Sequence, residues 1–183
     1  MTDILEEVAS ISAHAEGFWR QAHGWAPNEA ADLLSSARLH WLASFSRTLR
    51  ARVQEVESNP GEPADIILAW AHLRTLVEGH LKLYLTVFLT NYLAEPRVPR
   101  GKDGEPILPQ ALSFEKIRQF LIKTRLIAMH HAFIETVQKR GNSIHAFTDK
   151  PIGTADEYLA HIPLYRGFLS AIDTSLPLPD IPR

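Results

Sequence analysis

The sequence predicts an all-α fold, an antiparallel up-and-down bundle of four to six helices. Apolar residues recur every three or four positions over long stretches, which is the period of an amphipathic helix. No series of segments shows the sustained alternation that half-buried strands require. Clusters of Pro and Gly separate the periodic stretches, so consecutive helices can fold back beside one another. With 183 residues, 45% of them hydrophobic and 22% charged, the chain is long enough to build one domain around a real core.

The first two helices are predicted from their apolar faces. Over residues 2–17 the apolar side chains that share one face are Ile4, Leu5, Val8 and Ile11. Pro27 fits the opening of a second helix, and the periodic pattern that follows continues to Glu57. We therefore expect one short helix and one long helix in this part of the chain.

Pro63 fits the first position of a third helix that extends to about Leu93. Charged and histidine residues interrupt its apolar stretch, which is far short of the roughly 18 uninterrupted apolar residues of a membrane span. It is expected to be a core helix. Residues 95–111 are rich in Pro, Gly and charged groups, which predicts an exposed turn or a small hairpin.

Two further helices are predicted in the C-terminal half. Ser113 can cap a fourth helix, and Gly141 is typical of the residue that ends one. Thr154 and Glu157 have the spacing of a capping box, which predicts the start of a last helix that continues to about Ile172.

These elements predict one domain with short additions at both ends. The expected parts are an N-terminal helix and connector over residues 1–26, a bundle over 27–173 that contains the 95–111 loop, and a flexible tail over 174–183.

Composition excludes several classes of protein. The chain has no Cys, which excludes disulfides, thiolate nucleophiles and Cys-ligated metals. Its formal net charge of -2 gives no global basic field to gather nucleic acid or an anionic membrane. The acidic start of the chain does not resemble a signal peptide, so we expect a cytoplasmic protein without a membrane anchor.

Common enzyme motifs are absent. No Glu is followed three residues later by His, which excludes the di-iron pattern of helical bundles. The sequence also lacks a His-Glu-x-x-His zinc motif, a phosphate-binding Gly-rich loop and a nucleophile elbow. We therefore expect no metal and no cofactor, and any chemistry is left to His and Arg.

The most informative segment is 139–147, with the sequence Lys-Arg-Gly-Asn-Ser-Ile-His-Ala-Phe. The break at Gly141 and Asn142 can turn Arg140 and His145 toward one anion, although in a continuous helix they would point about 140 degrees apart. Arg neutralises phosphate and keeps its proton, whereas His exchanges a proton near neutral pH. This pair suits metal-free RNA cleavage, in which His145 moves the proton of a 2′-hydroxyl or of the leaving oxygen and Arg140 stabilises the phosphorane.

A helical bundle with Arg and Glu on its long third helix, followed by Arg-x4-His at the end of a later helix, resembles the HEPN domains of prokaryotic toxin and defence systems. The resemblance covers roughly residues 28–173. It implies a metal-independent ribonuclease that dimerises so that two Arg-x4–6-His motifs face each other. In this chain it implies that Arg140 and His145 are catalytic, with Asn142 as a polar helper and Glu78 as an orienting group. Many catalytic members have Asn, Asp or His directly after the Arg, where this chain has Gly141.

Two other charge patterns bear on this hypothesis. Arg74, Glu78 and Lys82 follow one another at four-residue intervals, as either a solvated stripe or a polar pocket in which Glu78 holds an arginine. Residues 113–140 include six Lys or Arg and two Glu. This excess of positive charge fits either a surface that follows an RNA backbone or a solvated helix face. Within this group, Lys139 and Arg125 are the candidate substrate-binding residues.

The motif spacing is not unique to 140–145. It also separates Arg74 from His80 and Arg125 from His130 and His131, inside segments predicted to be unbroken helices. Only residues 140–145 combine the spacing with a polar turn at a helix end.

Three hypotheses follow from the sequence. The first is a homodimeric, metal-independent endoribonuclease that acts as a toxin or in phage defence, with an antitoxin or other protein as its partner. The second is a non-catalytic module of the same type that binds RNA, nucleotide or a protein. The third is a purely structural or oligomerising helical protein, since a bundle fold alone fixes no function.

Overall fold

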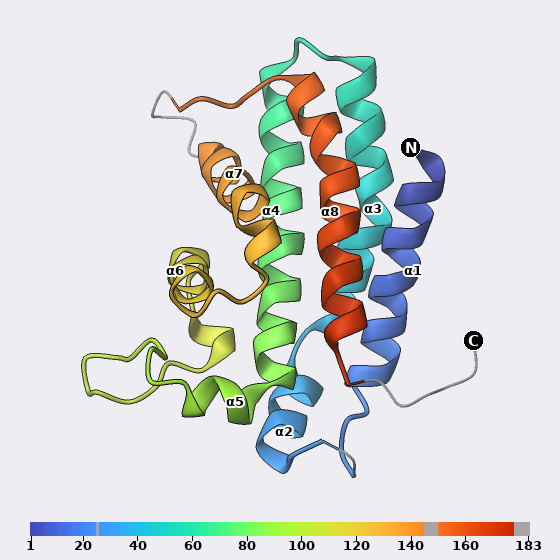
Figure 1. Ribbon diagram of the computed structural model, residues 1–183. Helices are drawn as coiled ribbons and strands as arrows, with labels where there is room; N and C mark the ends of the chain where they lie inside the picture. The colour runs from blue at the N-terminus through green and yellow to red at the C-terminus, as the bar shows by residue number, and fades with distance from the viewer. Residues whose placement is uncertain (25, 145–149, 178–183) are drawn as a thin grey trace.

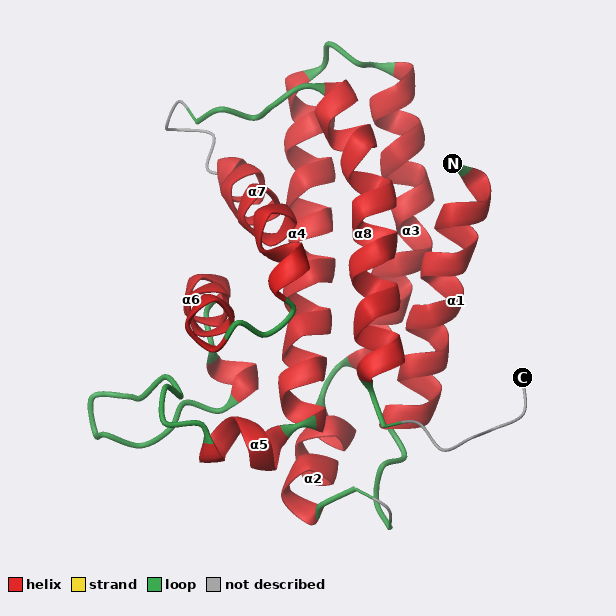
Figure 2. Ribbon diagram, viewed as in Figure 1, coloured by secondary structure: helices red, strands yellow, loops and turns green. Residues whose placement is uncertain are grey.

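The computed structural model describes residues 1–24, 26–144 and 150–177. The described part is helical throughout (Figures 1 and 2). Its α-helices are α1 (Thr2–Trp19), α2 (Asn28–Ser36), α3 (Leu39–Ser58), α4 (Pro63–Val87), α5 (Leu89–Ala94), α6 (Phe114–Thr124), α7 (His131–Gly141) and α8 (Ala155–Ser175). Short 3-10 helices occur at Pro109–Ala111, Ala128–His130 and Asn142–Ile144. The all-α prediction is confirmed.

The four long helices α1, α3, α4 and α8 lie side by side and form the core layer (Figure 1). Helix α3 is antiparallel to both α1 and α4. Helix α8, in contrast, runs in the same direction as α4, because the Trp70 ring meets Tyr158 and, further along both helices, His80 meets Tyr165. The strictly alternating up-and-down order predicted from the sequence is therefore not what the structure has.

The segment between α4 and α8 explains the parallel pair. Helix α5 leaves the far end of α4, and α6 and α7 then pack along the opposite side of α4 from α3 (Figure 1). They carry the chain back to the end of the bundle where α4 began. Helix α8 therefore starts there and runs beside α4 in the same direction. The crossing brings the end of α7 next to the start of α8.

The described residues contain eight α-helices rather than four to six, because three predicted helices are interrupted. The second breaks at Ala37 and Arg38, and the third at Phe88. The fourth breaks where Arg125 and Ile127 adopt left-handed backbone conformations, with φ of 59° and 43°. Such φ values are uncommon for residues other than Gly, so this break is locally strained.

The helix ends marked by strong sequence signals are confirmed. Pro63 occupies the first turn of α4, and the Ser113 hydroxyl accepts a hydrogen bond from the Lys116 amide at the start of α6. Helix α7 ends at Gly141, and Thr154 caps α8. In the 95–111 loop, an isolated antiparallel bridge joins Arg100 and Pro106, as a small hairpin would.

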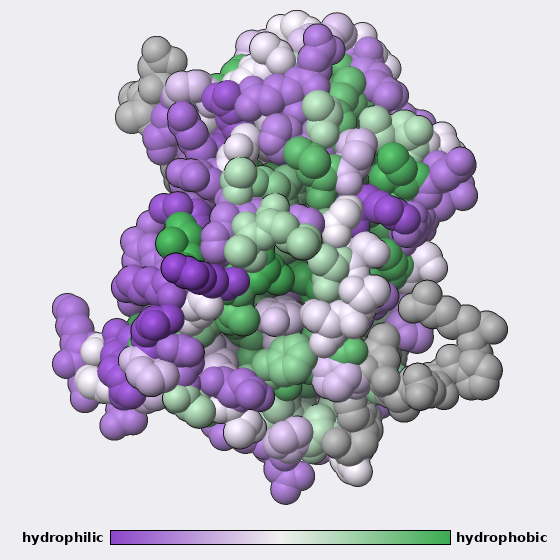
Figure 3. Space-filling model, viewed as in Figure 1, coloured by the Kyte–Doolittle hydropathy of each residue, from purple (hydrophilic) through white to green (hydrophobic). Residues whose placement is uncertain are grey.

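The core is aromatic where α4 faces α8. Trp70 is fully buried there and is unavailable as a surface for a partner, whereas Trp41 on α3 is 57% exposed. On the face drawn in Figure 3, hydrophobic side chains reach the surface in the middle of the molecule, beside the strongly hydrophilic outer sides of α6 and α7. Within the described ranges, no helix combines the length and apolar character needed to cross a membrane.

Candidate functional site

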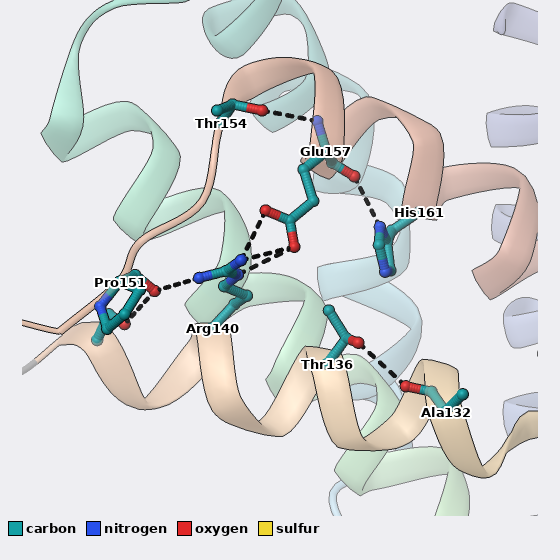
Figure 4. Close-up of polar contacts among 8 residues, drawn as sticks. Ala132, Thr136, Arg140, Pro151, Thr154, Glu157 and His161 are labelled. Carbon is teal, nitrogen blue, oxygen red and sulfur yellow. Dashed lines mark hydrogen bonds and ion pairs between the residues drawn. The ribbon is translucent and has the colours of Figure 1, made fainter.

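Arg140 lies in the last turn of α7 and is bound to the first turn of α8 (Figure 4). Its Nε and Nη2 donate hydrogen bonds to the Glu157 carboxylate at 2.9–3.0 Å, and Nη1 donates to the Pro151 carbonyl at 2.7 Å. The Arg140 side chain is 18% exposed and that of Glu157 is 28% exposed. This pair is a two-pronged, partly buried ion pair, the arrangement in which a guanidinium is held most rigidly.

Glu157 is fixed by its own helix. Its amide donates to the Thr154 hydroxyl at 3.1 Å, which confirms half of the predicted capping box. Its carbonyl accepts a hydrogen bond from Nδ1 of His161 at 2.7 Å, one turn along α8. A carboxylate in the first turn of a helix is also stabilised by the helix dipole. The acceptor for Arg140 is therefore held in position before any ligand arrives.

Gly141 allows α7 to end against α4. A Cβ added to Gly141 would come within 2.5 Å of the Cβ and Cδ atoms of Arg74. Only a residue without a side chain permits this approach. The requirement at this position is therefore close packing, and it brings the end of α7 onto the stretch of α4 that carries Arg74 and Glu78.

The described residues on either side of 145–149 lie close together. Asn142 begins the short 3-10 helix, and its carbonyl accepts a hydrogen bond from Nζ of Lys150 at 3.3 Å. The Ser143 hydroxyl lies 3.5 Å from the same Pro151 carbonyl that receives Arg140. Within the described residues, the Asn142 side-chain amide forms no hydrogen bond. His145 falls outside the described residues, so its predicted partnership with Arg140 stays a prediction.

Glu78 holds the cations of its own helix. It pairs with Lys82 at 2.9 Å and with Arg74 at 3.5 Å, each four residues away. The Arg74 guanidinium also lies over the Phe114 ring, 5.5 Å from its centroid. No hydrogen bond or ion pair joins Glu78 to Arg140 within the described residues. Glu78 thus acts on Arg74, the residue that packs against Gly141, and on Arg140 only through that packing.

The two predicted substrate-binding residues lie apart. Lys139 is exposed on the last turn of α7, next to Arg140. Arg125 is exposed at the end of α6, on the far side of the break before α7. Lys139 therefore belongs to the Arg140 end of the bundle, and Arg125 belongs to a different surface.

The second copy of the motif, from Arg125 to His130, spans a break rather than an unbroken helix. His130 packs edge-on against the Phe168 ring at 5.7 Å, and burial lowers the pKa of its imidazole. Its Nε2 is buried without a hydrogen-bond partner in the described structure. This histidine faces the core and not a solvent-accessible anion site.

Sequence reasoning did not find the partner of Arg140. Glu157 was assigned only a capping role, and Pro151 and Lys150 had none. The available signal was an acidic residue in the first turn of the helix after the motif, but 17 residues separate it from Arg140. Pairing them requires the parallel packing of α8 on α4, which the helical period does not encode.

The resulting arrangement is a preorganised cation. Arg74 and Arg140 are paired with Glu78 and Glu157, and Lys139 and Lys150 are the other cations in the segments that meet here, while Asp156 lies beside Glu157 in the first turn of α8. Arg140 uses four of its five N–H groups on Glu157 and Pro151, so one hydrogen on Nη1 has no partner within the described structure. Among the described residues, no three His, Asp or Glu side chains are grouped so that they could hold a metal ion.

No protein-family model matches this chain, and neither a curated protein nor a solved structure matches it.

Proposed function

We propose that the chain is a metal-independent endoribonuclease of the HEPN type, acting in the cytoplasm as a toxin or phage-defence effector. The observation that carries the proposal is the fixed position of Arg140. Its helix ends at the next residue, its guanidinium is held by Glu157 and Pro151, and the chain then continues as the 3-10 helix Asn142–Ile144, which directly precedes His145 in the sequence. A preorganised cation stabilises charge without having to reorganise during the reaction.

Each residue has a distinct chemical task in this proposal. Arg140 donates its remaining Nη1 hydrogen to a phosphate oxygen. If the phosphate displaces the Glu157 carboxylate, the Nε and Nη2 hydrogens of Arg140 can bind it as well. His145 takes or gives the proton of the 2′-hydroxyl or the leaving oxygen. The Asn142 amide supplies a further polar group, and Glu78 orients Arg74 beneath Gly141. Lys139 and Lys150 add positive charge along the path of the RNA backbone.

The catalytic unit is a homodimer in this proposal, with the Arg140 and His145 of two copies lining one site. A protein antitoxin that covers this end of the bundle would silence it. Mixing inactive variants tests the composite site, because a heterodimer of Arg140→Ala and His145→Ala retains one copy of each group. We expect such a mixture to recover part of the cleavage rate. A monomeric mass by light scattering, together with no recovery, would remove the dimer from the proposal.

A second candidate function is a non-catalytic module of the same type that binds RNA, nucleotide or a protein partner. The Arg140–Glu157 pair favours it, because the carboxylate already neutralises the guanidinium on which phosphate stabilisation depends. In this reading the pair is structural and joins α7 to α8. Binding would then survive the loss of either motif residue.

The two functions differ in a cleavage assay. A labelled RNA pool is incubated in EDTA with wild type, Arg140→Ala, His145→Ala and the control Arg47→Ala, which removes an exposed arginine from α3. Circular dichroism confirms that each variant is folded. We expect both motif variants to lose at least about 100-fold in rate and the control to lose none. Binding without cleavage by wild type would establish the second function instead.

A further inference from the structure

A second candidate site lies in the cleft between α4, α5 and α6. Its volume is about 330 Å³, at the lower end of the range for small-molecule sites. Four aromatic residues line it in two close pairs. The Tyr84 and Phe88 rings are 5.1 Å apart, as are the Tyr92 and Phe120 rings. Aromatic walls of this kind stack flat π-systems without regard to their exact identity.

Polar groups suited to a base edge also line the cleft. The Tyr92 hydroxyl is already used, since it donates to the Ile107 carbonyl at 2.6 Å. The Tyr84 hydroxyl and the Asn91 amide, in contrast, form no hydrogen bonds within the described residues, and both line the cleft. Glu95 completes the lining, with one carboxylate oxygen accepting from the Arg97 amide at 3.2 Å. An amide and a carboxylate are the side chains that pair with adenine and cytosine edges.

The rim of the cleft is cationic. Arg97 donates to the Lys123 carbonyl at 2.7 Å, which holds it beside the end of α6. Arg125 is exposed and stands between Thr124 and Leu126, both of which line the cleft. Arg97, whose Nε lies 4.0 Å from the Glu95 carboxylate, and the exposed Lys123 and Arg125 are thus close in space or in sequence to the lining, in which Glu95 is the one carboxylate. This balance suits a ligand with an aromatic part inside and an anionic part outside.

We propose that this cleft binds one nucleotide of single-stranded RNA, with the base stacked on one ring of the tilted Tyr84–Phe88 pair and the phosphate at the rim beside Arg125. The inference rests on the proposed function and names a base-recognition subsite for its substrate. Ten residues of α4 separate Arg74, against which Gly141 packs, from Tyr84, which corresponds to about 15 Å. A strand of a few nucleotides spans that distance.

Aromatic walls can bind either a nucleotide base or an organic cation, and the charge at the rim of the cleft favours one of them. A quaternary ammonium group also binds within aromatic rings, aided by a carboxylate such as Glu95. Arg97 lies 4.0 Å from Glu95 and so already partly neutralises that carboxylate, and the exposed Arg125 beside the lining repels a cation and attracts a phosphate. The structure therefore favours the nucleotide, and a cation is an alternative that the experiment can detect.

The test uses the 183-residue chain and four nucleoside monophosphates, titrated by isothermal calorimetry at low salt, with tetramethylammonium as the competing probe. The variants are Asn91→Ala and Arg125→Gly, both at exposed positions, and Arg47→Ala is the charge-matched control on α3. Gly accepts the left-handed conformation of residue 125 without strain, so Arg125→Gly should fold. Circular dichroism checks all variants.

We expect wild type to bind at least one monophosphate, with unequal affinities for the four bases. Asn91→Ala should lower the affinity for the preferred nucleotide about tenfold and bring the affinities for the four nucleotides closer together, because it removes the base-edge contact. Arg125→Gly should weaken all four to a similar extent, and Arg47→Ala none. Binding that no cleft variant alters, absence of nucleotide binding, or binding of tetramethylammonium alone would each overturn the proposal.

Failure of this proposal is distinguishable from failure of the proposed function. RNA cleavage that depends on Arg140 and His145 but is unchanged in rate and base preference by Asn91→Ala would remove the subsite and leave the nuclease. Nucleotide binding that depends on Asn91 and Arg125, without any cleavage, would leave the subsite and remove the nuclease.

Discussion

Arg140 at the end of α7 donates three hydrogen bonds to the carboxylate of Glu157 in the first turn of α8. This ion pair joins α7 to α8, a contact that the sequence pattern does not predict, and it fixes the guanidinium of the candidate catalytic arginine. The same contact therefore affects both the stability of the fold and the ability of Arg140 to bind phosphate.

Replacing Glu157 with Gln should lower the free energy of unfolding by about 1–3 kcal/mol, because the partly buried guanidinium loses its charged partner. Urea denaturation monitored by circular dichroism measures this change. The matched control is Glu7→Gln, which removes a similarly short ion pair to Arg166 on the exposed surface between α1 and α8. If Glu7→Gln lowered the free energy of unfolding as much as Glu157→Gln does, the Arg140–Glu157 pair would stabilise the fold no more than an exposed ion pair, contrary to this prediction.

The same Glu157→Gln protein separates the two roles of Arg140. If phosphate must displace the carboxylate, removing its charge should raise RNA affinity several-fold at low salt, because Arg140 becomes the free cation. Filter binding with Arg140→Ala as the baseline measures the effect. An affinity that falls to the level of Arg140→Ala would instead mean that Glu157 positions the arginine for RNA.

Gly141→Ala should lower stability by about 1–3 kcal/mol, since the new methyl group overlaps the inner atoms of the Arg74 side chain. Gly167 on α8 is the control, because nothing lies within 4 Å of a Cβ added there. Gly167→Ala should be neutral or stabilise by up to about 1 kcal/mol, as Ala favours a helix interior. Thermal denaturation of the pair is sufficient, and equal effects would refute the close packing of α7 on α4.

His80 should make the protein sensitive to acid. It is fully buried, its Nδ1 donates to the Leu76 carbonyl, and its Nε2 accepts from the Ser12 hydroxyl, which in turn accepts from Ser46. Burial lowers the pKa of His80 from 6.5 to about 4, against the opposing effect of the Leu76 bond. The Tyr165 hydroxyl, 3.4 Å away, is the other titratable group at this ring, and burial keeps it neutral by raising its pKa.

Because the folded protein resists protonation of His80, the unfolded chain binds the proton first as pH falls below about 6.5. Stability should therefore decline between about pH 6.5 and pH 4, by about 3 kcal/mol in all, and should not depend on this group above pH 7. Denaturation at several pH values compares wild type with His80→Gln, which lacks the titrating ring. Parallel stability curves for the two proteins over this range would refute the assignment.

Arg125→Gly should leave stability unchanged or raise it by up to about 1 kcal/mol, despite the loss of a full side chain. Residue 125 has φ 59°, a conformation that costs Arg energy and Gly none. Urea denaturation checks this, with Arg125→Ala as the control that should not stabilise. A large loss on the change to Gly would mean that the arginine side chain itself holds the break between α6 and α7.

The helix signals that are local in sequence are the ones that the structure confirms. Pro63, Ser113, Gly141 and Thr154 each act on the backbone within a turn of themselves, so their effect can be predicted without knowing the fold. The break at Arg38 has no such signal. Apolar periodicity continues across it, and Ala37 and Arg38 are both good helix formers, so tertiary packing decides the interruption.

In the candidate site, too, the features set by neighbouring residues could be predicted from the sequence, and those set by tertiary packing could not. The end of α7 directly after Arg140 could be predicted, because Gly141 and Asn142 are adjacent to it. The pairing with Glu157 could not, because it depends on α5, α6 and α7 returning the chain so that α8 runs parallel to α4. For Gly141, the sequence predicts the helix end but not the close approach to Arg74, because Arg74 lies on another helix.

We propose that Arg140 and His145 cleave RNA through the 2′-hydroxyl without a metal. The most direct measurement is single-turnover cleavage in EDTA of one oligonucleotide in RNA form and in fully 2′-deoxy form, by wild type and by folded His145→Ala. We predict that wild type cleaves only the RNA and that His145→Ala loses this activity by at least about 100-fold. Cleavage of both substrates, cleavage that survives His145→Ala, or activity that appears only when a divalent metal is added would contradict the claim.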